Sequence, residues 1–437
     1  MNTVLFLVRK DKISIRRYLL VARQLKELNI DSCFLNLTDY RGIIKETVEE
    51  LGLSDFSEYR VDYYKSRSLT DMLQLVISKI KKHIVRKISN NTKGRACIDF
   101  QRGAPAQDNF EDILKQLDFD TSAIVEQYYK ANIDWWDVNV RLANNRLTKI
   151  KPCCIVYDLE VEPIVRSFLF AAKEEKIPVV SMQHGEGFGE QYSNFPRLAD
   201  YYIAYSPYSF EKIKNLQVQD KDIYLTGMPD TDLIYGYSSS RIKEDIGLRY
   251  DINCDKKIIL VALRPANVEA FNEINMVLID TVAKIFGNNE EFCILIKPHN
   301  IDYVEGIPFR YKKLLYENFR IIDSDYPFFM LLKISQYVIT HSSSCVVEAG
   351  LMGVSTIVID FDSGCVWPPW DVYKTFNNIP LSQLEQVLNE IENNTYDFKC
   401  VEEARKQFVE RFRFKYDDKS AERIAGVIKH IIEEICH

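Results

Sequence analysis

Short apolar runs alternate along the chain with segments whose apolar residues recur at helical spacing. The first run, Thr3–Val8, predicts a strand, Ile13–Leu28 predicts a helix, and Ser32–Leu37 predicts a second strand. A strand, a helix and another strand in this order are typical of a parallel sheet covered by helices. The alternation resumes later with the predicted strands Cys154–Asp158 and Pro178–His184, which flank a predicted helix.

A second series of predicted strands, again separated by helices, begins near residue 206. Its strands are expected at Ile223–Thr226, Lys257–Leu263, Phe292–Lys297, Arg320–Ile322, Tyr337–Thr340 and Thr356–Asp360. Three predicted helices follow, at Leu381–Glu392, Val401–Phe412 and Ser420–Ile435. Two such series indicate an α/β protein with two Rossmann-like, doubly wound domains facing a cleft. We expect the domains to span residues 1–205 and 206–437.

A stretch at about residues 68–149 interrupts the first series and has a mostly helical pattern. Its part near Lys79–Arg95 carries a cluster of Lys and Arg beside an apolar face. Such a helix can pack on the domain core, lie on an anionic membrane surface or bind an acidic polymer. We favour core packing, with the basic face left for a membrane or an acceptor.

Composition narrows the class of protein. The 437 residues are 46% hydrophobic with a net charge of −7, which disfavours nucleic acid as the main partner. The ten cysteines include no Cys-x-x-Cys spacing, as expected in a reducing cytosol. No run approaches the roughly 18 apolar residues of a membrane span. We therefore expect a cytoplasmic protein, with the inner face of the membrane as an alternative location.

Polar residues follow the predicted strands, where open parallel sheets bind their ligands. They are Asp158, His184, Arg264, Lys297, His299 and the run His341–Ser344. The sequence holds only six histidines, and three of them fall in this set. Because the carboxyl ends of parallel strands meet at one edge of a sheet, these side chains are expected to gather around a ligand.

The run His-Ser-Ser-Ser precedes a predicted helix and gives the most specific local signal. Ser342, Ser343 and Ser344 would occupy the helix start, where free N–H groups and hydroxyls favour a phosphate. A simple capping role for one serine is the alternative. Glu348, four residues after Ser344, could reach a ribose hydroxyl or lie on a solvated face.

Lys297 and His299 leave a strand on either side of a proline, and both suit a phosphate or diphosphate. Arg264 also follows a strand, and its planar guanidinium matches phosphate geometry. His184 ends the last predicted strand of the first domain, before a loop with three glycines and Glu186. An imidazole at the cleft suits a general base, although it could simply hydrogen-bond the loop.

Together these segments resemble bacterial surface-polysaccharide transferases of the GT-B fold. The resemblance is to CDP-glycerol glycerophosphotransferases and to capsule sialyl- and Kdo-transferases, and UDP-N-acetylglucosamine 2-epimerases share the scaffold. It rests on Gln183-His184-Gly185, Lys297-Pro298-His299-Asn300 and Ser343-Ser344, and Ser420, Glu422 and Arg423 of the last helix match by type. Residues 206–437 would then hold the nucleotide-sugar donor, and residues 1–205 the acceptor.

The resemblance implies a glycosyltransferase that moves a sugar or polyol phosphate unit from a CMP-, CDP- or UDP-linked donor to a glycan or glycolipid. We expect an inverting reaction without metal or cofactor, with His184, or failing it Asp158 or Glu186, as the base. Lys297, His299 and the serine run would stabilise the leaving phosphate. The alternatives are a 2-epimerase-like enzyme and a non-catalytic scaffold that binds a polysaccharide or partner enzyme.

Overall fold

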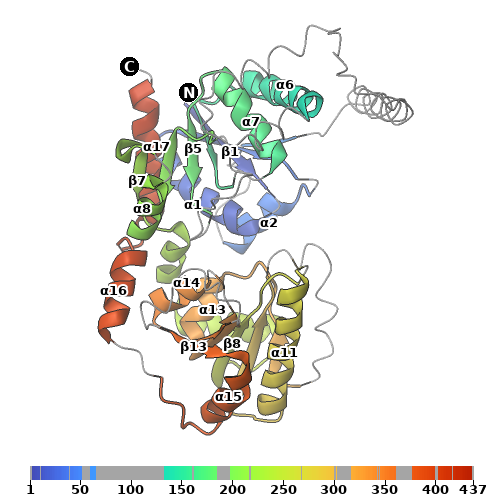
Figure 1. Ribbon diagram of the computed structural model, residues 1–437. Coiled ribbons are helices and arrows are strands. Elements are labelled where there is room, and N and C mark those ends of the chain that lie inside the picture. The colour runs from blue at the N-terminus through green and yellow to red at the C-terminus, as the bar shows by residue number, and fades with distance from the viewer. Residues whose placement is uncertain are drawn as a thin grey trace, which may run out of the picture.

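The protein folds around two parallel β-sheets, each covered by helices (Figure 1). The computed structural model describes residues 2–9, 11–38, 40–51, 60–64, 132–159, 162–184, 197–215, 218–266, 268–299, 302, 316–341, 343, 345–360, 376–398, 402–415 and 417–435.

The first sheet has seven strands in the order β3-β2-β1-β4-β5-β6-β7, and every pairing is parallel. The strands are β1 (Thr3–Val8), β2 (Asp31–Asn36), β3 (Arg60–Tyr63), β4 (Cys154–Tyr157), β5 (Val179–Met182), β6 (Tyr201–Ala204) and β7 (Ile223–Leu225). All residues of β1, β4 and β5 are buried, which explains their nearly continuous apolar sequence.

Helices cover both faces of this sheet, with α1 and α17 on one face and α6 and α7 on the other. The helices of this part are α1 (Lys12–Glu27), α2 (Ile43–Glu50), α6 (Ile133–Ile150), α7 (Pro163–Glu174) and α8 (Pro207–Lys214). Helix α1 begins directly after β1 because the Asp11 carboxylate accepts the N–H of Ile13 at 3.0 Å.

The second sheet has six strands in the order β10-β9-β8-β11-β12-β13, again all parallel. They are β8 (Lys257–Ala262), β9 (Phe292–Lys297), β10 (Phe319–Ile321), β11 (Tyr337–His341), β12 (Ser355–Asp360) and β13 (Asn377–Pro380). The helices here are α9 (Leu233–Gly236), α10 (Ser239–Tyr250), α11 (Glu269–Phe286), α13 (Phe328–Ile334), α14 (Cys345–Met352) and α15 (Leu384–Glu392). Among the described residues, short 3₁₀ helices lie at Asp220–Asp222, before β7, and at Pro229–Asp232 and Leu381–Gln383.

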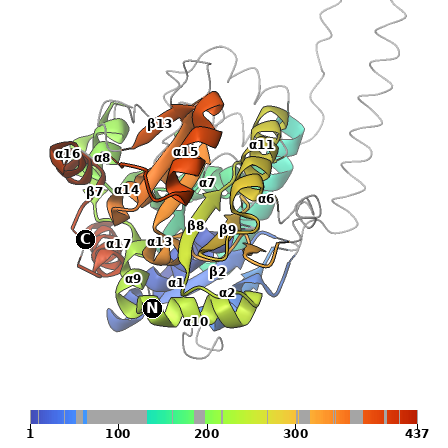
Figure 2. The ribbon, with the colours of Figure 1, turned by 90° about the horizontal axis from the view of Figure 1, so that it is seen from below.

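The chain then returns to the first sheet. Helix α16 (Glu402–Phe412) lies between the two parts, and α17 (Ser420–Ile435) packs against α1 (Figure 1). Seen from below, the second sheet with α11 and α15 lies in front of the first sheet, and α17 lies at one side (Figure 2). The Asp232 carboxylate accepts the N–H groups of Ser420 and Ala421 at 3.2 and 2.9 Å, and Arg423 donates to the Thr226 carbonyl at 2.6 Å. These bonds hold the start of α17.

The two doubly wound domains and the closing helices predicted from the sequence are confirmed, with one correction. The strand at Ile223, expected to open the second series, pairs with β6 and completes the first sheet. Helix α8 separates these two strands, as helices separate the strands within both series, so the strand pattern alone gave no sign of a domain change. We propose that the boundary lies after Leu225, instead of between residues 205 and 206.

Three strands were missed, namely β3, β6 and β13. Strands β3 and β13 are short sheet edges with several polar residues, and β6 is apolar but only four residues long. Within the expected helical insertion at 68–149, the structure describes only α6 and its flanks, and the basic segment Lys79–Arg95 lies outside the described residues. None of the described helices combines the length and apolar character that crossing a bilayer requires.

Candidate active site

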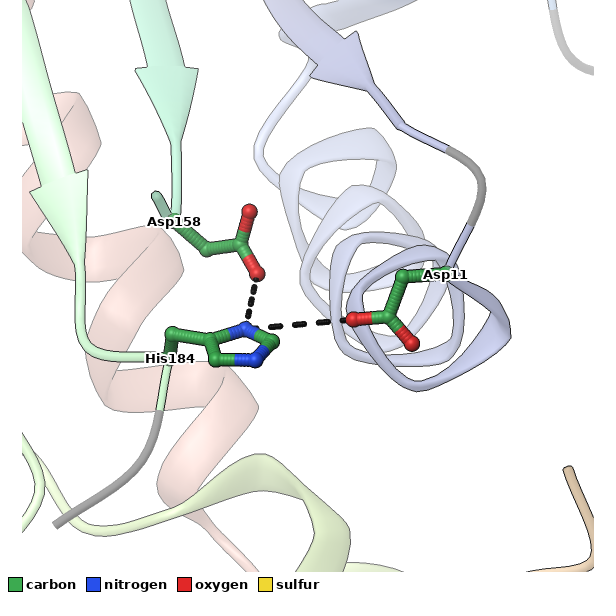
Figure 3. Close-up of side chains that lie close together, drawn as sticks. All are labelled: Asp11, Asp158 and His184. Carbon is green, nitrogen blue, oxygen red and sulfur yellow. Dashed lines mark hydrogen bonds and ion pairs between the residues drawn. The ribbon is translucent and has the colours of Figure 1, made fainter. Parts of the chain in front are cut away.

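Four polar side chains meet at the carboxyl edge of the first sheet, at its topological switch point. Arg9 and Asp11 follow β1, Asp158 follows β4, and His184 follows β5. Figure 3 shows Asp11, Asp158 and His184. The chain continues from β1 to β2 on one side of the sheet and from β4 to β5 on the other. The connections after β1 and β4 therefore diverge and leave space for side chains between them.

The Asp158 carboxylate is the centre of this cluster and is buried. It accepts from Arg9 Nε and Nη2 at 3.2 and 3.3 Å, from the Tyr18 hydroxyl at 3.0 Å, and from the Ser14 hydroxyl. Burial alone would raise the pKa of Asp158, but Arg9 and His184 outweigh it and hold this pKa far below its usual range. Asp158 is therefore ionised near neutral pH.

His184 is tied to this carboxylate through one ring nitrogen. Its Nδ1 lies 2.7 Å from Asp158 Oδ2 and 3.8 Å from Asp11 Oδ2. An ionised carboxylate only accepts hydrogen bonds, so Nδ1 carries the hydrogen and a neutral ring keeps its lone pair on Nε2. Nε2 points away from both carboxylates (Figure 3), and 36% of the side chain is exposed.

Arg17, on α1, fixes the main chain of the same histidine. Its Nη1 donates to the His184 carbonyl at 2.5 Å, and its Nε pairs with Asp230 at 2.5 Å. The guanidinium also lies over the Tyr205 ring, 5.4 Å from its centroid. Side chain and main chain of His184 are thus held from two directions, by Asp158 and by Arg17.

Asp11, Asp158 and His184 offer three ligand atoms within 4.8 Å of one another, a donor set that could hold a metal ion. Arg9 offsets part of the negative charge of this set, because it pairs with Asp158 through two nitrogens and lies 3.5 Å from Asp11. Burial would raise the pKa of Asp11, yet His184 and Arg9 lower it below its ordinary value. Both carboxylates can therefore stay ionised beside Arg9 and His184.

The second sheet contributes a set of basic side chains from its own strand ends. Lys297 ends β9, His299 follows two residues later, and Arg264 follows the neighbouring strand β8. Burial lowers the pKa of Lys297 to about 7, while Asp325 acts in the opposite direction. Burial, together with Arg264 and Lys297, lowers the pKa of His299 to about 4. Basic groups that are buried or half-buried and disfavour one another's charge favour an anionic ligand.

The start of α14 lies beside this group. Ser343 accepts the N–H of Cys345 through its hydroxyl at 3.4 Å, as a capping residue does. Glu348 is half-buried one turn further on. Its charge counteracts the effect of burial on the pKa of Lys297 and raises the pKa of Arg17, as Asp230 and Tyr205 do more strongly. Ser342, Ser344 and Glu186 lie outside the described residues.

Electrostatic interactions link the two sets across the sheets. Asp11 and His184 of the first sheet act on the pKa of His299, and Glu348 acts on that of Arg17. The structure thus brings together His184, Asp158, Lys297, His299, Arg264 and Glu348, which the sequence had named separately. A cavity of about 520 Å³ lined by Phe376, Glu390 and Tyr396 lies elsewhere, at the start of β13, and none of the site residues lines it.

Sequence reasoning missed Arg9, Asp11 and Arg17. Arg9 and Asp11 directly follow the first strand, so the rule that found Asp158 and His184 would also have found them. Arg17 has no comparable signal, because it sits within a helix rich in Arg and Lys and only the tertiary fold shows which of them turns inward.

Comparison with known proteins places this arrangement among nucleotide-sugar enzymes. A family model described as UDP-N-acetylglucosamine 2-epimerase matches residues 170–429. A Staphylococcus aureus MnaA–UDP structure has a TM-score of 0.60 and 13% identity, covering 100% of this chain and 98% of its own. The UDP-GlcNAc 2-epimerase of Neisseria meningitidis bound to UDP-GlcNAc gives 0.58 and 14%, covering 99% and 100%.

The fold is also shared with a polymerase. The wall teichoic acid polymerase TagF, as the H444N form with CDPG, has a TM-score of 0.55 and 14% identity, covering 100% of this chain and 90% of its own. The comparison with curated proteins gives no match.

The paired sheets and their shared strand order have the GT-B fold, and the family match makes the chain a nucleotide-sugar enzyme of that fold. More narrowly, the chain belongs to the UDP-N-acetylglucosamine 2-epimerase family.

Proposed function

We propose that this protein acts on a UDP-linked sugar as a 2-epimerase-like enzyme, with His184 as the group that moves a proton. One observation carries the proposal, the 2.7 Å contact between His184 Nδ1 and Asp158 Oδ2. It leaves Nε2 as a base on a ring that two other groups hold in place. Membership of the family and the likeness to UDP and UDP-GlcNAc complexes favour a UDP-linked sugar over CMP- or CDP-linked ones.

Epimerisation at a ring carbon requires a base that removes the hydrogen from one face and an acid that returns a proton to the other. His184 can take a proton on Nε2, and Asp158 then stabilises the imidazolium that forms. Asp11, 3.8 Å from Nδ1, adds a second negative charge on the same side. A cation that forms in this pocket is therefore stabilised by two buried carboxylates.

The other sheet would bind the diphosphate. Lys297, His299 and Arg264 supply positive charge and donors, and the start of α14 supplies main-chain N–H groups near Ser343. Glu348 lies close enough to Lys297 to act on its pKa and could accept from a ribose hydroxyl. These roles assign the nucleotide to the second sheet and the sugar to the space toward His184.

The decisive experiment offers UDP-N-acetylglucosamine in D₂O without any acceptor and follows the sugar by NMR. An epimerase produces the 2-epimer and exchanges the hydrogen at C2 for deuterium. His184→Gln should abolish both signals, whereas His430→Gln, a change at an exposed histidine of α17, should leave both unchanged. Absence of epimer and of deuterium in the unaltered protein would contradict the proposal.

A second candidate is a glycosyltransferase, favoured by the same histidine and by the likeness to TagF. A neutral imidazole backed by a buried carboxylate can deprotonate an acceptor hydroxyl as well as a carbon. In that case the nucleotide-sugar alone stays unchanged, apart from slow hydrolysis. Release of UDP that depends on an added glycan or glycolipid, and is lost in His184→Gln, would support the transferase.

A further inference from the structure

A buried asparagine joins the two central strands of the second sheet at its own switch point. Asn275, on α11, is fully buried. Its Nδ2 donates to the Arg264 carbonyl at 2.8 Å, and its Oδ1 accepts the Arg264 N–H at 3.2 Å. The same Oδ1 lies 2.8 Å from Nε2 of His341, the last residue of β11. One amide therefore holds the exits of β8 and β11 together.

These bonds determine the tautomer of His341. Because Nδ2 of Asn275 donates to the Arg264 carbonyl, the atom facing His341 is the oxygen, which only accepts. Nε2 of His341 must then carry the hydrogen. Burial and the nearby Arg264 lower the pKa of His341 to about 3, so the ring stays neutral. A neutral ring with its hydrogen on Nε2 adds no further positive charge beside Arg264.

Phe271, one turn before Asn275 on the same face of α11, supports the Arg264 side chain. The guanidinium lies over the Phe271 ring at 4.4 Å from its centroid, and the His341 ring is 5.8 Å from that ring. Arg264 Nε is buried, and within the described part of the chain no protein group accepts from it. No carboxylate among the described residues pairs with this guanidinium either. A half-buried cation without a counter-ion pays part of the cost of losing water, and an anionic ligand would offset that cost.

We propose that Asn275 is a positioning residue, which fixes the main chain of Arg264 and the tautomer of His341 so that the guanidinium faces the diphosphate of a nucleotide. The ligand in this inference rests on the proposed function. The positioning itself rests only on the three contacts of Asn275 and on the stacking against Phe271. Asn275 contacts no reacting atom and acts through Arg264.

Titration calorimetry with UDP tests the inference on the full chain. We expect Asn275→Ala to raise the Kd for UDP about tenfold, as the loss of hydrogen bonds that order a charged group would. Asn272→Ala is the matched control, since it makes the same change on the same helix and Asn272 makes no side-chain bond to Arg264 or His341. Its Kd should equal that of the unaltered protein. Equal Kd values for Asn275→Ala and the unaltered protein would overturn the inference.

A second measurement, without ligand, does not depend on the proposed function. The ¹⁵N spectrum of histidine-labelled protein reports the tautomer of each ring, and His341→Gln identifies the His341 signals. We expect hydrogen on Nε2 in the unaltered protein and a mixture of tautomers in Asn275→Ala. Asn275→Asp keeps the acceptor for His341 but places an oxygen against the Arg264 carbonyl, so it should keep the tautomer and still weaken UDP binding.

The two arms separate the possible failures. An unchanged tautomer in Asn275→Ala overturns the positioning role whatever UDP does. An unaltered protein that binds neither UDP nor inorganic pyrophosphate overturns the proposed function and the ligand assigned to Arg264. If Asn275→Ala does not fold, Asn275→Asp carries the test, because it has nearly the same volume.

Discussion

The Nζ atom of Lys12, on the first helix, lies 2.6 Å from the carboxylate of Asp325, in the loop between β10 and α13 of the second sheet. Arg16 Nη2 donates to the carbonyl of the same residue at 2.7 Å. Next to it in sequence, the Ser324 carbonyl accepts from Lys297. This loop therefore links the basic face of α1 to the lysine that we assign to the nucleotide diphosphate.

Asp325→Asn should weaken UDP binding, and more so at pH 8 than at pH 6. Asp325 raises the pKa of Lys297 against the effect of burial, so without it less of the lysine is charged near neutrality. A change of one pKa unit corresponds to about a tenfold effect, and we expect a rise in Kd of about three- to tenfold. Calorimetry at both pH values measures it.

Glu50→Gln is the control for this change. Glu50 pairs with the same Lys12 at 2.6 Å but within the first domain. The Kd of Glu50→Gln for UDP should stay within about twofold of that of the unaltered protein, as is typical of the loss of an exposed ion pair. Equal effects of both variants would mean that only the charge of Lys12 matters, and not its link to the second sheet.

Asp158→Asn should reduce turnover about a thousandfold or more while leaving the Kd for UDP nearly unchanged. An amide at this position can donate to Nδ1 of His184, which would put the ring hydrogen on Nε2 and remove the base. Comparing kcat with the Kd for UDP checks the prediction. Because Arg9 also loses its ionised partner, the melting temperature of Asp158→Asn is measured as a control for folding. A folded variant with normal turnover would contradict the role of Asp158.

UDP binding should be accompanied by proton uptake between pH 7 and 9. The pKa of Lys297 is about 7 without ligand, and a diphosphate beside it raises that pKa. Affinity should then fall as pH rises above 7, because binding must also protonate the lysine. Calorimetry in buffers of different ionisation enthalpy counts the protons. Lys297→Arg should abolish the uptake, since arginine stays charged throughout; uptake that persists in this variant would assign it to another group.

Two glycines provide a matched test of the junction with α17. Gly227 has φ of +88°, and a Cβ there would lie 2.8 Å from Ser420 Oγ and 2.9 Å from the Phe414 carbonyl. Gly227→Ala should lower the free energy of unfolding by roughly 1–3 kcal/mol, from backbone strain and the clash together. Gly426 is exposed on α17 with nothing within 4 Å, so Gly426→Ala should raise it by roughly 0.5–1 kcal/mol. Denaturant unfolding of both variants measures these two changes in the free energy of unfolding, which should have opposite signs.

Much of the fold could be predicted because buried parallel strands leave a strong sequence signal. The predicted Thr3–Val8 and Phe292–Lys297 match β1 and β9, both buried along their whole length. The signal fails where burial is incomplete, as in β3, whose residues are exposed or half-buried. The sheet to which a strand belongs, as for β7, depends on partners far away in sequence.

The candidate site was predictable to the extent that strand ends define it. His184, Asp158, Lys297 and His299 were all found by their place after a strand. What the sequence could not show is the set of contacts between them. Asp158 fixes the His184 ring, Arg17 holds the His184 carbonyl, and Asn275 joins the ends of two strands. These contacts all depend on helices that pack across the sheet edge.

The return of α17 to α1 also has a consequence for how the protein forms in the cell. Isoleucines of α17, including Ile424, Ile428 and Ile431, cover apolar residues of α1 such as Tyr18 and Val21. While the ribosome is still translating the second sheet, that face of the first helix has no cover. The apolar face of α1 therefore stays exposed until Ser420–Ile435 has been synthesised. We expect chaperones to bind the incomplete chain at this surface.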